Sequence, residues 1–223
     1  MSRDMDLSSC LAGPGEPLGE HLVSVMEEMR RDPVFDPVAR KLARVFGIRP
    51  ELAMDLLEFT ALAHDVGKAD VAYKNADKYF PLHEARSADF AFYVLAKAGA
   101  LRANDLAALD AGNAVITAVA LHHYSHKTYN TEKTKTGFKA RCRSYAEAFH
   151  SWTPRTAEGA ALKEVAASTL DVAGYGVYAV VVQNIRRIGG NAKLRSAASA
   201  LLGLLNKADR TVARRRRHVS GGV

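Results

Sequence analysis

The sequence is poor in cysteine and has no long apolar run. Its two cysteines, Cys10 and Cys142, lie far apart and form no CxxC pair, so the sequence indicates neither a disulfide framework nor a zinc knuckle. The longest apolar stretch, around residues 175–182, is too short to span a bilayer, and no basic-then-apolar leader opens the chain. We therefore expect a soluble, cytoplasmic protein that does not bind membranes.

Most of the chain also lacks an excess of positive charge. The 223 residues carry a formal charge of +7, with 48% hydrophobic and 25% charged residues, which is ordinary for a soluble globular protein. Residues 124–143 and residues 207–218 each hold six cations and one anion, so the rest of the chain has a slight negative balance. Positive charge concentrated in two segments favours a polyanionic partner.

Helical spacing of apolar residues recurs along the chain, and convincing strand patterns are scarce. The sequence predicts helices over residues 18–30, 38–46, 50–65, 82–98, 104–121, 140–149, 157–170 and 191–217. The remaining segments lack this period and are rich in polar or turn residues: residues 1–17 are predicted to be an irregular lead-in, 68–81 a polar loop and 124–139 a basic surface loop. The predicted fold class is all-α, with a single domain over residues 1–223.

Several helix boundaries are expected from proline and glycine. Asp36-Pro37 should separate the first helix from the second, and Gly67 should end the third helix in a left-handed conformation. Gly112 leaves open whether residues 104–121 form one helix or two. Residues 175–182 would suit a buried strand or a buried helix, and we interpret them as a helix because no second strand is convincing.

Metal-ligand side chains stand at the ends or on the inner faces of these helices. His64 and Asp65 end an apolar run, and consecutive helical residues sit roughly 100° apart around the axis. This divergence suits an imidazole on one metal ion and a carboxylate that bridges to a second. Asp209 lies on an apolar face, where carboxylates are rarely buried unpaired. The further candidates are His21, His83, His122 and His123.

Plainer explanations exist for single members of this set. His21 alone would suit a partly buried core histidine, and His83 alone a surface residue at a helix start. The pair His122-His123 is harder to explain in this way, because two imidazoles that end an apolar helix need partners. A bound metal would satisfy all of these side chains at once.

In their order along the chain, these residues resemble the HD superfamily of metal-dependent phosphohydrolases, and more narrowly the HD nuclease of type I CRISPR interference systems. The resemblance rests on Gly15-Glu16-Pro17-Leu18-Gly19-Glu20-His21-Leu22, His64-Asp65-Val66-Gly67-Lys68, His83-Glu84-Ala85-Arg86-Ser87-Ala88, Leu121-His122-His123 and the late Asp209. The sequence after His123 lacks the Asp-Gly-x-Gly-Tyr-Pro run of the cyclic-dinucleotide branch, which argues against that branch.

The resemblance implies an all-α HD domain with an internal dinuclear metal site. It assigns one ion to His21, His64, Asp65 and Asp209, and a second ion to Asp65, His83, His122 and His123, so that Asp65 bridges. Mixed imidazole and carboxylate ligation favours Mn²⁺, Co²⁺, Ni²⁺ or Fe²⁺, with Mg²⁺ possible. Two such ions can stabilise the attacking and leaving oxygens at phosphorus.

Asp65 and Lys68 are the catalytic candidates. Lys68 would either neutralise a phosphate oxygen or be a solvated loop lysine. Aromatic residues interleave the cations of residues 124–145, and such segments stack on unpaired bases while their cations follow the phosphates. We expect single-stranded nucleic acid, DNA in preference to RNA, to contact Lys68, Lys127, Lys133, Lys135, Lys139, Arg141 and Arg143.

The chain has no G-x-x-x-x-G-K-[ST] phosphate loop and no room for a motor domain. The resemblance therefore implies a stand-alone nuclease that works with a separate CRISPR helicase subunit and the CRISPR effector complex. The run Arg214–Arg217 could bind nucleic acid, dock on an acidic partner, or do neither.

Two other functions are open. The first is an HD phosphohydrolase acting on nucleotides or other small phosphate esters, although two basic segments exceed what a mononucleotide needs. The second is a non-catalytic nucleic-acid-binding module, which the filled ligand positions disfavour.

Overall fold

The chain folds into a bundle of helices. The computed structural model describes residues 10–74, 76, 78–100, 106–123, 137–177 and 191–220. Its helices are α1 (Leu18–Arg31), α2 (Phe35–Phe46), α3 (Pro50–Ala63), α4 (His83–Lys97), α5 (Leu106–Leu121), α6 (Ser144–Ser151), α7 (Ala157–Ser168) and α9 (Ala192–Ser220), with the 3₁₀ turns η1 (Val66–Ala69) and η2 (Val71–Tyr73). This architecture confirms the predicted all-α class.

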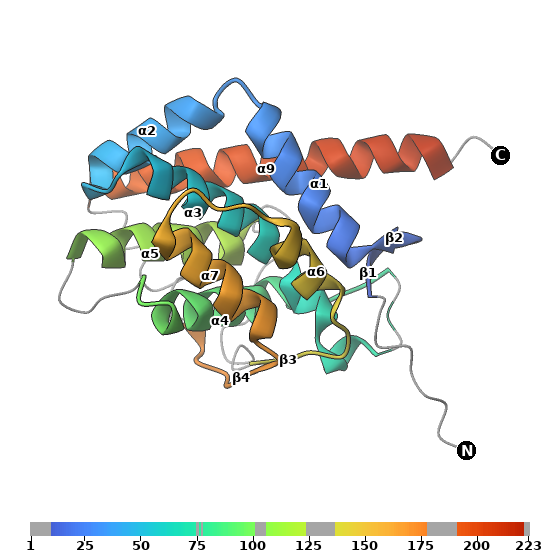
Figure 1. Cartoon of the computed structure of the whole chain (residues 1–223). Helices are drawn as coiled ribbons and strands as arrows, with labels where there is room; N and C mark the ends of the chain where they lie inside the picture. Colours follow the sequence, from blue (N-terminus) through green and yellow to red (C-terminus); the bar gives the residue numbers. More distant parts are fainter. Residues whose placement is uncertain are drawn as a thin grey trace, which may run out of the picture.

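Two short antiparallel ribbons accompany the helices. One pairs β1 (Leu11–Gly13) with β2 (Glu16–Pro17), and the other pairs β3 (Phe138–Lys139) with β4 (Asp171–Val172). The long helix α9 packs against α1, α2 and α5, and Figure 1 shows it running past the N-terminal half of the bundle. The two ends of the described chain therefore pack on each other.

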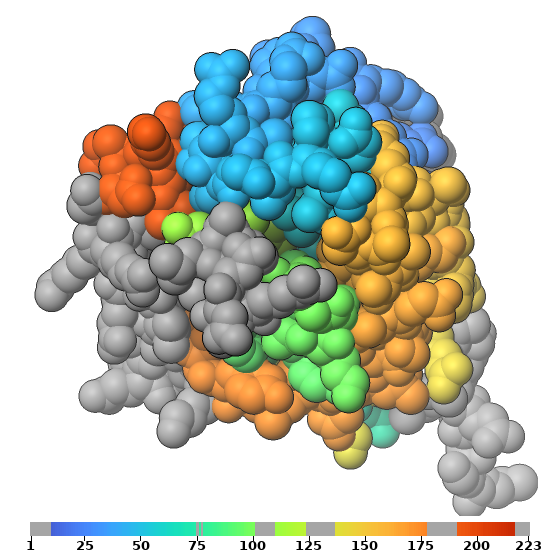
Figure 2. All heavy atoms as spheres, turned by 60° about the vertical axis from the view of Figure 1, so that its left-hand side comes forward, coloured from blue at the N-terminus to red at the C-terminus, as the bar shows by residue number. Residues whose placement is uncertain are grey.

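The central element is α3, because all of its residues from Asp55 to Ala63 are buried. A helix that is apolar nearly all round belongs in the core of a protein. It packs against α1, α2, α5 and α7. Figure 2 shows the side of the molecule near the start of this helix, where α2 and α7 form much of the surface. Its other end carries His64 and Asp65 into the interior.

Most predicted helices are confirmed, with local differences at their boundaries. Pro37 lies inside the first turn of α2 instead of before it, where the missing N–H of proline is tolerated. Gly112 does not interrupt α5, so residues 106–121 form one helix. Gly47 ends α2 with a φ of 63°, as a left-handed stop requires. Asn191 caps α9, since its Oδ1 accepts from the backbone N–H groups of Lys193 and Leu194.

Gly67 does not have the predicted left-handed conformation, and α3 has already ended at Ala63. Gly67 lies instead in η1, pressed against the start of α4. A Cβ there would lie 2.0 Å from the carbonyl oxygen of His83 and 2.9 Å from the backbone nitrogen of Ser87. The Gly67 N–H donates to Ser87 Oγ at 2.8 Å. Glycine is required here by close backbone approach.

The N-terminal segment also differs from the prediction. Residues 1–9 lie outside the described part of the chain, but from Cys10 onward the lead-in forms the β1–β2 hairpin. Cys10 and Cys142 are joined in a disulfide across 132 residues, so the expectation of no disulfide is wrong. Sequence spacing failed because the two cysteines meet only through tertiary packing.

The predicted loops are only partly covered by the structure. Residues 68–81 contain η2 and the end of η1, and the end of the basic loop, Phe138–Lys139, forms β3. Residues 124–136 and 178–182 lie outside the described part, so the basic loop and the helix expected over residues 175–182 stay largely predictions. None of the helices in the described segments combines the length and apolarity that a membrane crossing requires.

Candidate metal centre

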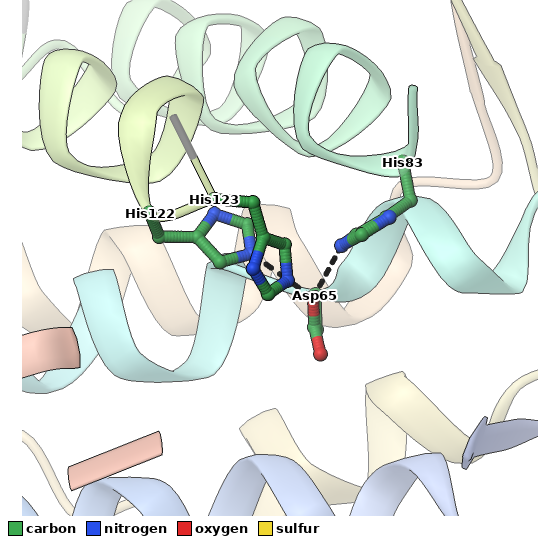
Figure 3. A group of neighbouring side chains, drawn as sticks. All are labelled: Asp65, His83, His122 and His123. Atoms are coloured by element: carbon green, nitrogen blue, oxygen red, sulfur yellow. Dashed lines mark hydrogen bonds and ion pairs between the residues drawn. The ribbon is translucent and has the colours of Figure 1, made fainter. Parts of the chain in front are cut away.

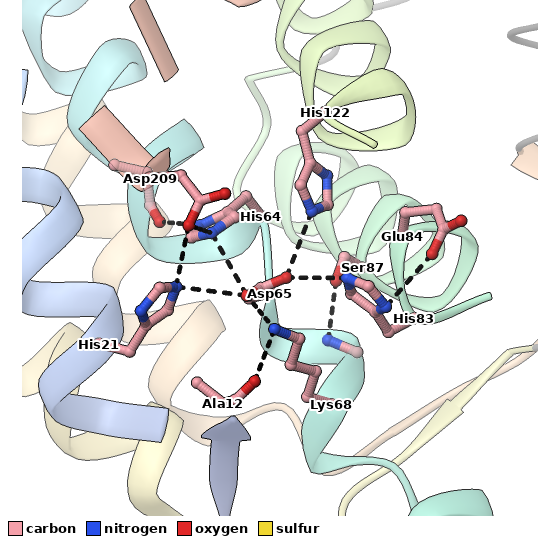
Figure 4. A network of polar contacts seen from close by, with 12 residues as sticks. Ala12, His21, His64, Asp65, Lys68, His83, Glu84, Ser87, His122 and Asp209 are labelled. Carbon is pink, nitrogen blue, oxygen red and sulfur yellow. Dashed lines mark hydrogen bonds and ion pairs between the residues drawn. The ribbon is translucent and has the colours of Figure 1, made fainter. Parts of the chain in front are cut away.

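The seven predicted ligands come together, with the carboxylate of Asp65 at the centre (Figures 3 and 4). His21 comes from α1, and His64 and Asp65 follow α3. His83 is the first residue of α4, His122 and His123 follow the end of α5, and Asp209 lies in α9. In Figure 4, His21 and His64 lie on one side of Asp65, and His83 and His122 lie on the other.

One group of ligands faces Oδ2 of Asp65. The donor atoms of His21, His64 and Asp209 lie within 4.8 Å of one another. Nε2 of His21 is 3.3 Å from Asp65 Oδ2 and 3.5 Å from Asp209 Oδ1. Nε2 of His64 is 3.5 Å from Asp65 Oδ2 and 3.9 Å from Asp209 Oδ1. We call these three residues the first ligand group.

The second ligand group, His83, His122 and His123, faces the other oxygen of Asp65 (Figure 3). Its donor atoms and that of Asp65 lie within 4.8 Å of one another. Nε2 of His83 is 3.0 Å, and Nε2 of His122 is 3.3 Å, from Asp65 Oδ1. Each oxygen of the carboxylate therefore serves one group, which is the arrangement that a bridging ligand needs.

In four of the five imidazoles, the contact of the second nitrogen fixes which nitrogen faces the cluster. Nδ1 of His64, His83 and His122 lies 2.6 to 2.7 Å from the backbone carbonyl three residues earlier. Nδ1 of His21 lies 2.8 Å from Glu16 Oε1. Because these oxygens only accept, each Nδ1 carries a proton and donates it. Within the described residues, Nε2 of His21, His64 and His83 has no hydrogen-bond partner. Buried nitrogens oriented in this way suit metal coordination.

Burial keeps three of the imidazoles in the neutral form that binds metal. Burial lowers the pKa of His64 to about 4. Burial, with the neighbouring His122, lowers the pKa of His123 to about 2. The pKa of His83 is lowered by burial as well. These three side chains therefore fit a divalent ion without first losing a proton.

The charge of the cluster resides on the other members. Burial disfavours protonation of His21, but the carboxylates of Asp65 and Glu16 outweigh it and raise its pKa to about 9. Asp65 likewise raises the pKa of His122 against the effect of burial. Burial opposes ionisation of Asp65, yet the ammonium group of Lys68 and the neighbouring imidazoles hold its pKa well below the usual range. A bound cation would balance the negative charge of Asp65, which protonated side chains balance in this structure.

Lys68 is part of this cluster and not a solvated loop lysine. Its Nζ lies 2.6 Å from Asp65 Oδ2 and donates to the carbonyl oxygen of Ala12 at 2.8 Å. Only 12% of its side chain is exposed. The position follows from η1, which turns Lys68 back toward the carboxylate three residues earlier. Its ammonium group therefore stands beside the candidate ligands.

A pocket of about 930 Å³ opens onto the cluster. The N-terminal hairpin and its turn form one part of its wall, and α9 forms another. Its lining residues are Ala12, Gly13, Pro14, Gly15, Glu16, Glu20, His21, Asp65, Lys68, His123, Asp209, Ala213 and Arg216. Members of both ligand groups are thus within reach of a ligand that enters this pocket.

The predicted nucleic-acid-binding residues are only partly placed. Lys127, Lys133 and Lys135 lie outside the described segments. Lys139 and Arg143 are exposed and Arg141 is half-buried. The segment that carries them lies against η1, since the backbone N–H of Arg141 donates to the carbonyl oxygen of Ala69. The three cations thus lie on a segment that packs against η1, the element that positions Lys68. They do not line the pocket.

Part of the basic run at the end of α9 is engaged within the molecule. Arg215 Nη1 lies 2.6 Å from Glu28 Oε2. Arg216 Nε lies 3.1 Å from Glu16 Oε1, and its Nη2 lies 3.4 Å from Glu20 Oε2. These ion pairs join α9 to α1 and the hairpin. Their acidic partners in the first helix could not be identified from sequence spacing.

Glu16 and Ser87 belong to the motifs around His21 and His83, but the sequence predicted no role for either residue. Glu16 holds Nδ1 of His21, and Ser87 holds the backbone of η1. Their occurrence next to the ligands in the motifs was the only available signal. Their hydrogen bonds depend on tertiary packing.

Residues 38–172, more than half of the chain, match the family model described as the HD domain. No curated protein matches the chain.

Proposed function

The chain belongs to the HD domain family, and we propose that it is a metal-dependent phosphohydrolase that cleaves single-stranded nucleic acid, DNA in preference to RNA. Membership of the HD family indicates metal-dependent phosphate hydrolysis in general. The observation that carries the proposal is the sharing of Asp65. One oxygen faces His21 and His64, and the other faces His83 and His122.

Two divalent ions would be held by the two ligand groups. The first ligand group and Asp65 would hold one, and the second ligand group and Asp65 would hold the other. Imidazole-rich donor sets favour Mn²⁺, Co²⁺, Ni²⁺ or Fe²⁺ over Mg²⁺. When bound, such ions supply Lewis acidity and an activated water for displacement at phosphorus.

The chain's own residues provide orientation and charge. The carbonyl oxygens behind His64, His83 and His122 fix the direction of their Nε2 atoms. Lys68 places an ammonium group at the pocket wall, where it can donate to a non-bridging phosphate oxygen. Hydrolysis adds water across one P–O bond and releases a phosphate monoester and an alcohol.

We further propose a role in CRISPR interference, with single strands supplied by a separate helicase subunit and the effector complex. Support comes from the narrower resemblance. The motif around His83 includes Ser87, which holds the backbone of η1, and the motif around His21 includes Glu16, which holds His21. The motif residues thus act together at one site, beyond the ligands that HD enzymes share.

A second candidate is hydrolysis of nucleotides or other small phosphate esters. The volume of the pocket, about 930 Å³, lies within the range of small-molecule sites. The pairing of Arg215 and Arg216 with glutamates also leaves less free positive charge for a polyanion than the sequence suggested. These two observations favour a small substrate.

The deciding experiment compares substrates and one variant. The purified chain is incubated with Mn²⁺ and single-stranded DNA, single-stranded RNA, duplex DNA or free nucleotides. We expect cleavage of single-stranded DNA, reduced to background by Asp65→Ala and retained by Asp36→Ala, which removes an exposed carboxylate from α2. Undiminished cleavage by Asp65→Ala contradicts the assignment. Faster phosphate release from nucleotides than oligonucleotide cutting favours the second candidate.

A further inference from the structure

One imidazole of the first ligand group, His21, is held by a different kind of contact from His64, His83 and His122. His64, His83 and His122 donate from Nδ1 to a carbonyl oxygen one turn earlier in their own segment. Such contacts are local and form whenever the segment folds. Glu84, the neighbour of His83, adds a carboxylate 3.3 Å from the same Nδ1, again from the same helix.

His21 is held differently. Its Nδ1 contacts the side chain of Glu16, which lies in β2 and is mostly buried, with 13% of the side chain exposed. The same oxygen of Glu16 lies 3.1 Å from Nε of Arg216 on α9. A chain of contacts therefore runs from Arg216 through Glu16 to His21, in which Glu16 is shared by the hairpin and the last helix.

The position of Glu16 depends on tertiary packing of the hairpin. The carbonyl oxygen of Ala12, in β1, accepts from Lys68. The carbonyl oxygen of Cys10 accepts from the N–H of Leu18, and the disulfide ties Cys10 to Cys142. Contacts to η1 and α9 and the link to Cys142 thus set where the Glu16 carboxylate stands.

We propose that Glu16 is a positioning residue for the metal ion of the first ligand group, and that Arg216 holds Glu16 in place. Carboxylates behind metal-binding histidines orient the ring and increase its basicity, and their loss typically costs about 10- to 100-fold in metal affinity. In the described part of the chain, the hydrogen bonds and ion pairs of the Glu16 side chain are with His21 and Arg216, so the second ligand group should not depend on it. The inference rests on the proposed function insofar as the cluster binds metal.

The test measures Co²⁺ binding to the full-length chain by calorimetry and visible absorption, in two backgrounds. His83→Ala leaves only the first ligand group complete, and Asp209→Ala leaves only the second. In the His83→Ala background, Glu16→Ala should weaken Co²⁺ binding about 10- to 100-fold and change the Co²⁺ spectrum. Glu16→Gln, which keeps an acceptor oxygen, should weaken it less. In the Asp209→Ala background, neither change should alter affinity.

Arg216 provides an independent variant and a matched control. Arg216→Ala should weaken the first site in the same direction as Glu16→Gln. Arg215→Ala removes the neighbouring ion pair to Glu28, which does not reach Glu16, and should leave Co²⁺ affinity unchanged. Circular dichroism checks that each variant is folded, and the isosteric Glu16→Gln serves if Glu16→Ala is not.

Three results overturn the inference. Equal affinity of the first site with and without Glu16 shows that Glu16 does not position His21. An equal loss in both backgrounds shows general damage to the cluster. Failure of the unaltered chain to bind any Co²⁺ removes the metal centre itself, and with it the proposed function, whereas the first two results leave that function standing.

Discussion

At the scale of single residues, the distance between Asp65 and His83 depends on Gly67. Asp65 precedes η1 and His83 begins α4, and these two elements are in contact through Gly67. The N–H of Gly67 donates to Ser87, and no side chain fits between its Cα and the carbonyl oxygen of His83. A small shift of this contact would move one ligand relative to the other.

We predict that Gly67→Ala destabilises the fold by about 1 to 3 kcal/mol, as insertion of a methyl group into packed structure does, and weakens metal binding by the second ligand group. Urea unfolding and Co²⁺ titration measure the two effects. Gly203→Ala is the control. A Cβ at Gly203 in α9 meets no atom within 4 Å, so this change should stabilise the fold by about 0.5 to 1 kcal/mol. Equal stability of both variants would contradict the prediction.

The ligands themselves were predictable because histidines and aspartates at helix ends or on apolar faces conflict with ordinary core composition. Glu16 and Gly67 were harder. In the sequence, Glu16 looks like any acidic residue near the start of a helix. Its role depends on His21 and Arg216, which come close to it only in the folded chain. Gly67 has the pattern of a helix stop, whereas its function is to let two backbones approach.

At the scale of elements, α3 carries two buried carboxylates, Asp55 and Glu58, among mostly apolar residues. Glu58 is fully buried and joins α3 to α1 and to the connection between α6 and α7. It accepts two hydrogen bonds of 2.7 Å from Arg30 and one of 2.7 Å from Trp152 Nε1, and it pairs with Arg155 at 2.7 Å. The helix that delivers Asp65 is thus fixed to its neighbours by polar contacts as well as by packing.

Glu58 should make the stability of the fold sensitive to acid. Burial opposes its ionisation, but Arg30, Trp152 and Arg155 outweigh burial and lower its pKa below 4.5. A lowered folded-state pKa means that the carboxylate stabilises the fold fully above about pH 4.5, and that this contribution is lost as the pH falls through the folded-state pKa.

We predict that Glu58→Gln lowers the unfolding free energy by about 2 to 3 kcal/mol at neutral pH, and that the difference from the unaltered chain shrinks as the pH falls below about 4.5. Urea titrations across this pH range measure it. The control is Glu158→Gln, which breaks an exposed ion pair with Arg49 and should cost less than about 1 kcal/mol. A difference that is independent of pH would contradict the role assigned to Glu58.

The hairpin is the element that sequence patterns missed, and the disulfide is its covalent anchor. A cross-link spanning 132 residues restricts the unfolded chain strongly. We predict that reduction lowers the unfolding free energy by about 3 to 5 kcal/mol and weakens metal binding by the first ligand group, because Glu16 moves with the hairpin.

Urea unfolding and Co²⁺ titration with and without a dithiol reductant test this prediction. Reduction exchanges one disulfide for two thiols and oxidises the reductant. The double variant Cys10→Ala/Cys142→Ala should give the same urea unfolding and Co²⁺ titration curves with and without the reductant. This controls for effects of the reductant on Co²⁺. Two titratable thiols in the untreated protein would show that the disulfide is absent.

At the scale of the whole molecule, sequence periodicity predicted the helices because most of them bury one apolar face. It did not predict how residues far apart meet. The β1–β2 hairpin, the Cys10–Cys142 link and the ion pairs between α9 and α1 all join distant segments. A pattern of period 3.6 describes one element, whereas these contacts depend on the packing of several.

The candidate metal centre joins the same distant segments, since its predicted ligands extend from His21 in α1 to Asp209 in α9. An ion held by the first ligand group would connect the first helix, the central helix and the last helix. Because the unfolded chain separates these ligands, it cannot reproduce the site. A ligand that binds only the folded state stabilises it by about 2.7 kcal/mol at 100 times its dissociation constant.

We therefore predict that excess Mn²⁺ raises the melting temperature by about 5 to 10 °C for each occupied site, given about 2 to 4 °C per kcal/mol for a chain of this size. Differential scanning calorimetry measures the shift, and a chelator should reverse it. Asp65→Ala removes the residue shared by both ligand groups and should abolish the shift, whereas Asp209→Ala should retain the part that belongs to the second group. An equal shift in the unaltered chain and Asp65→Ala would place metal binding elsewhere on the molecule.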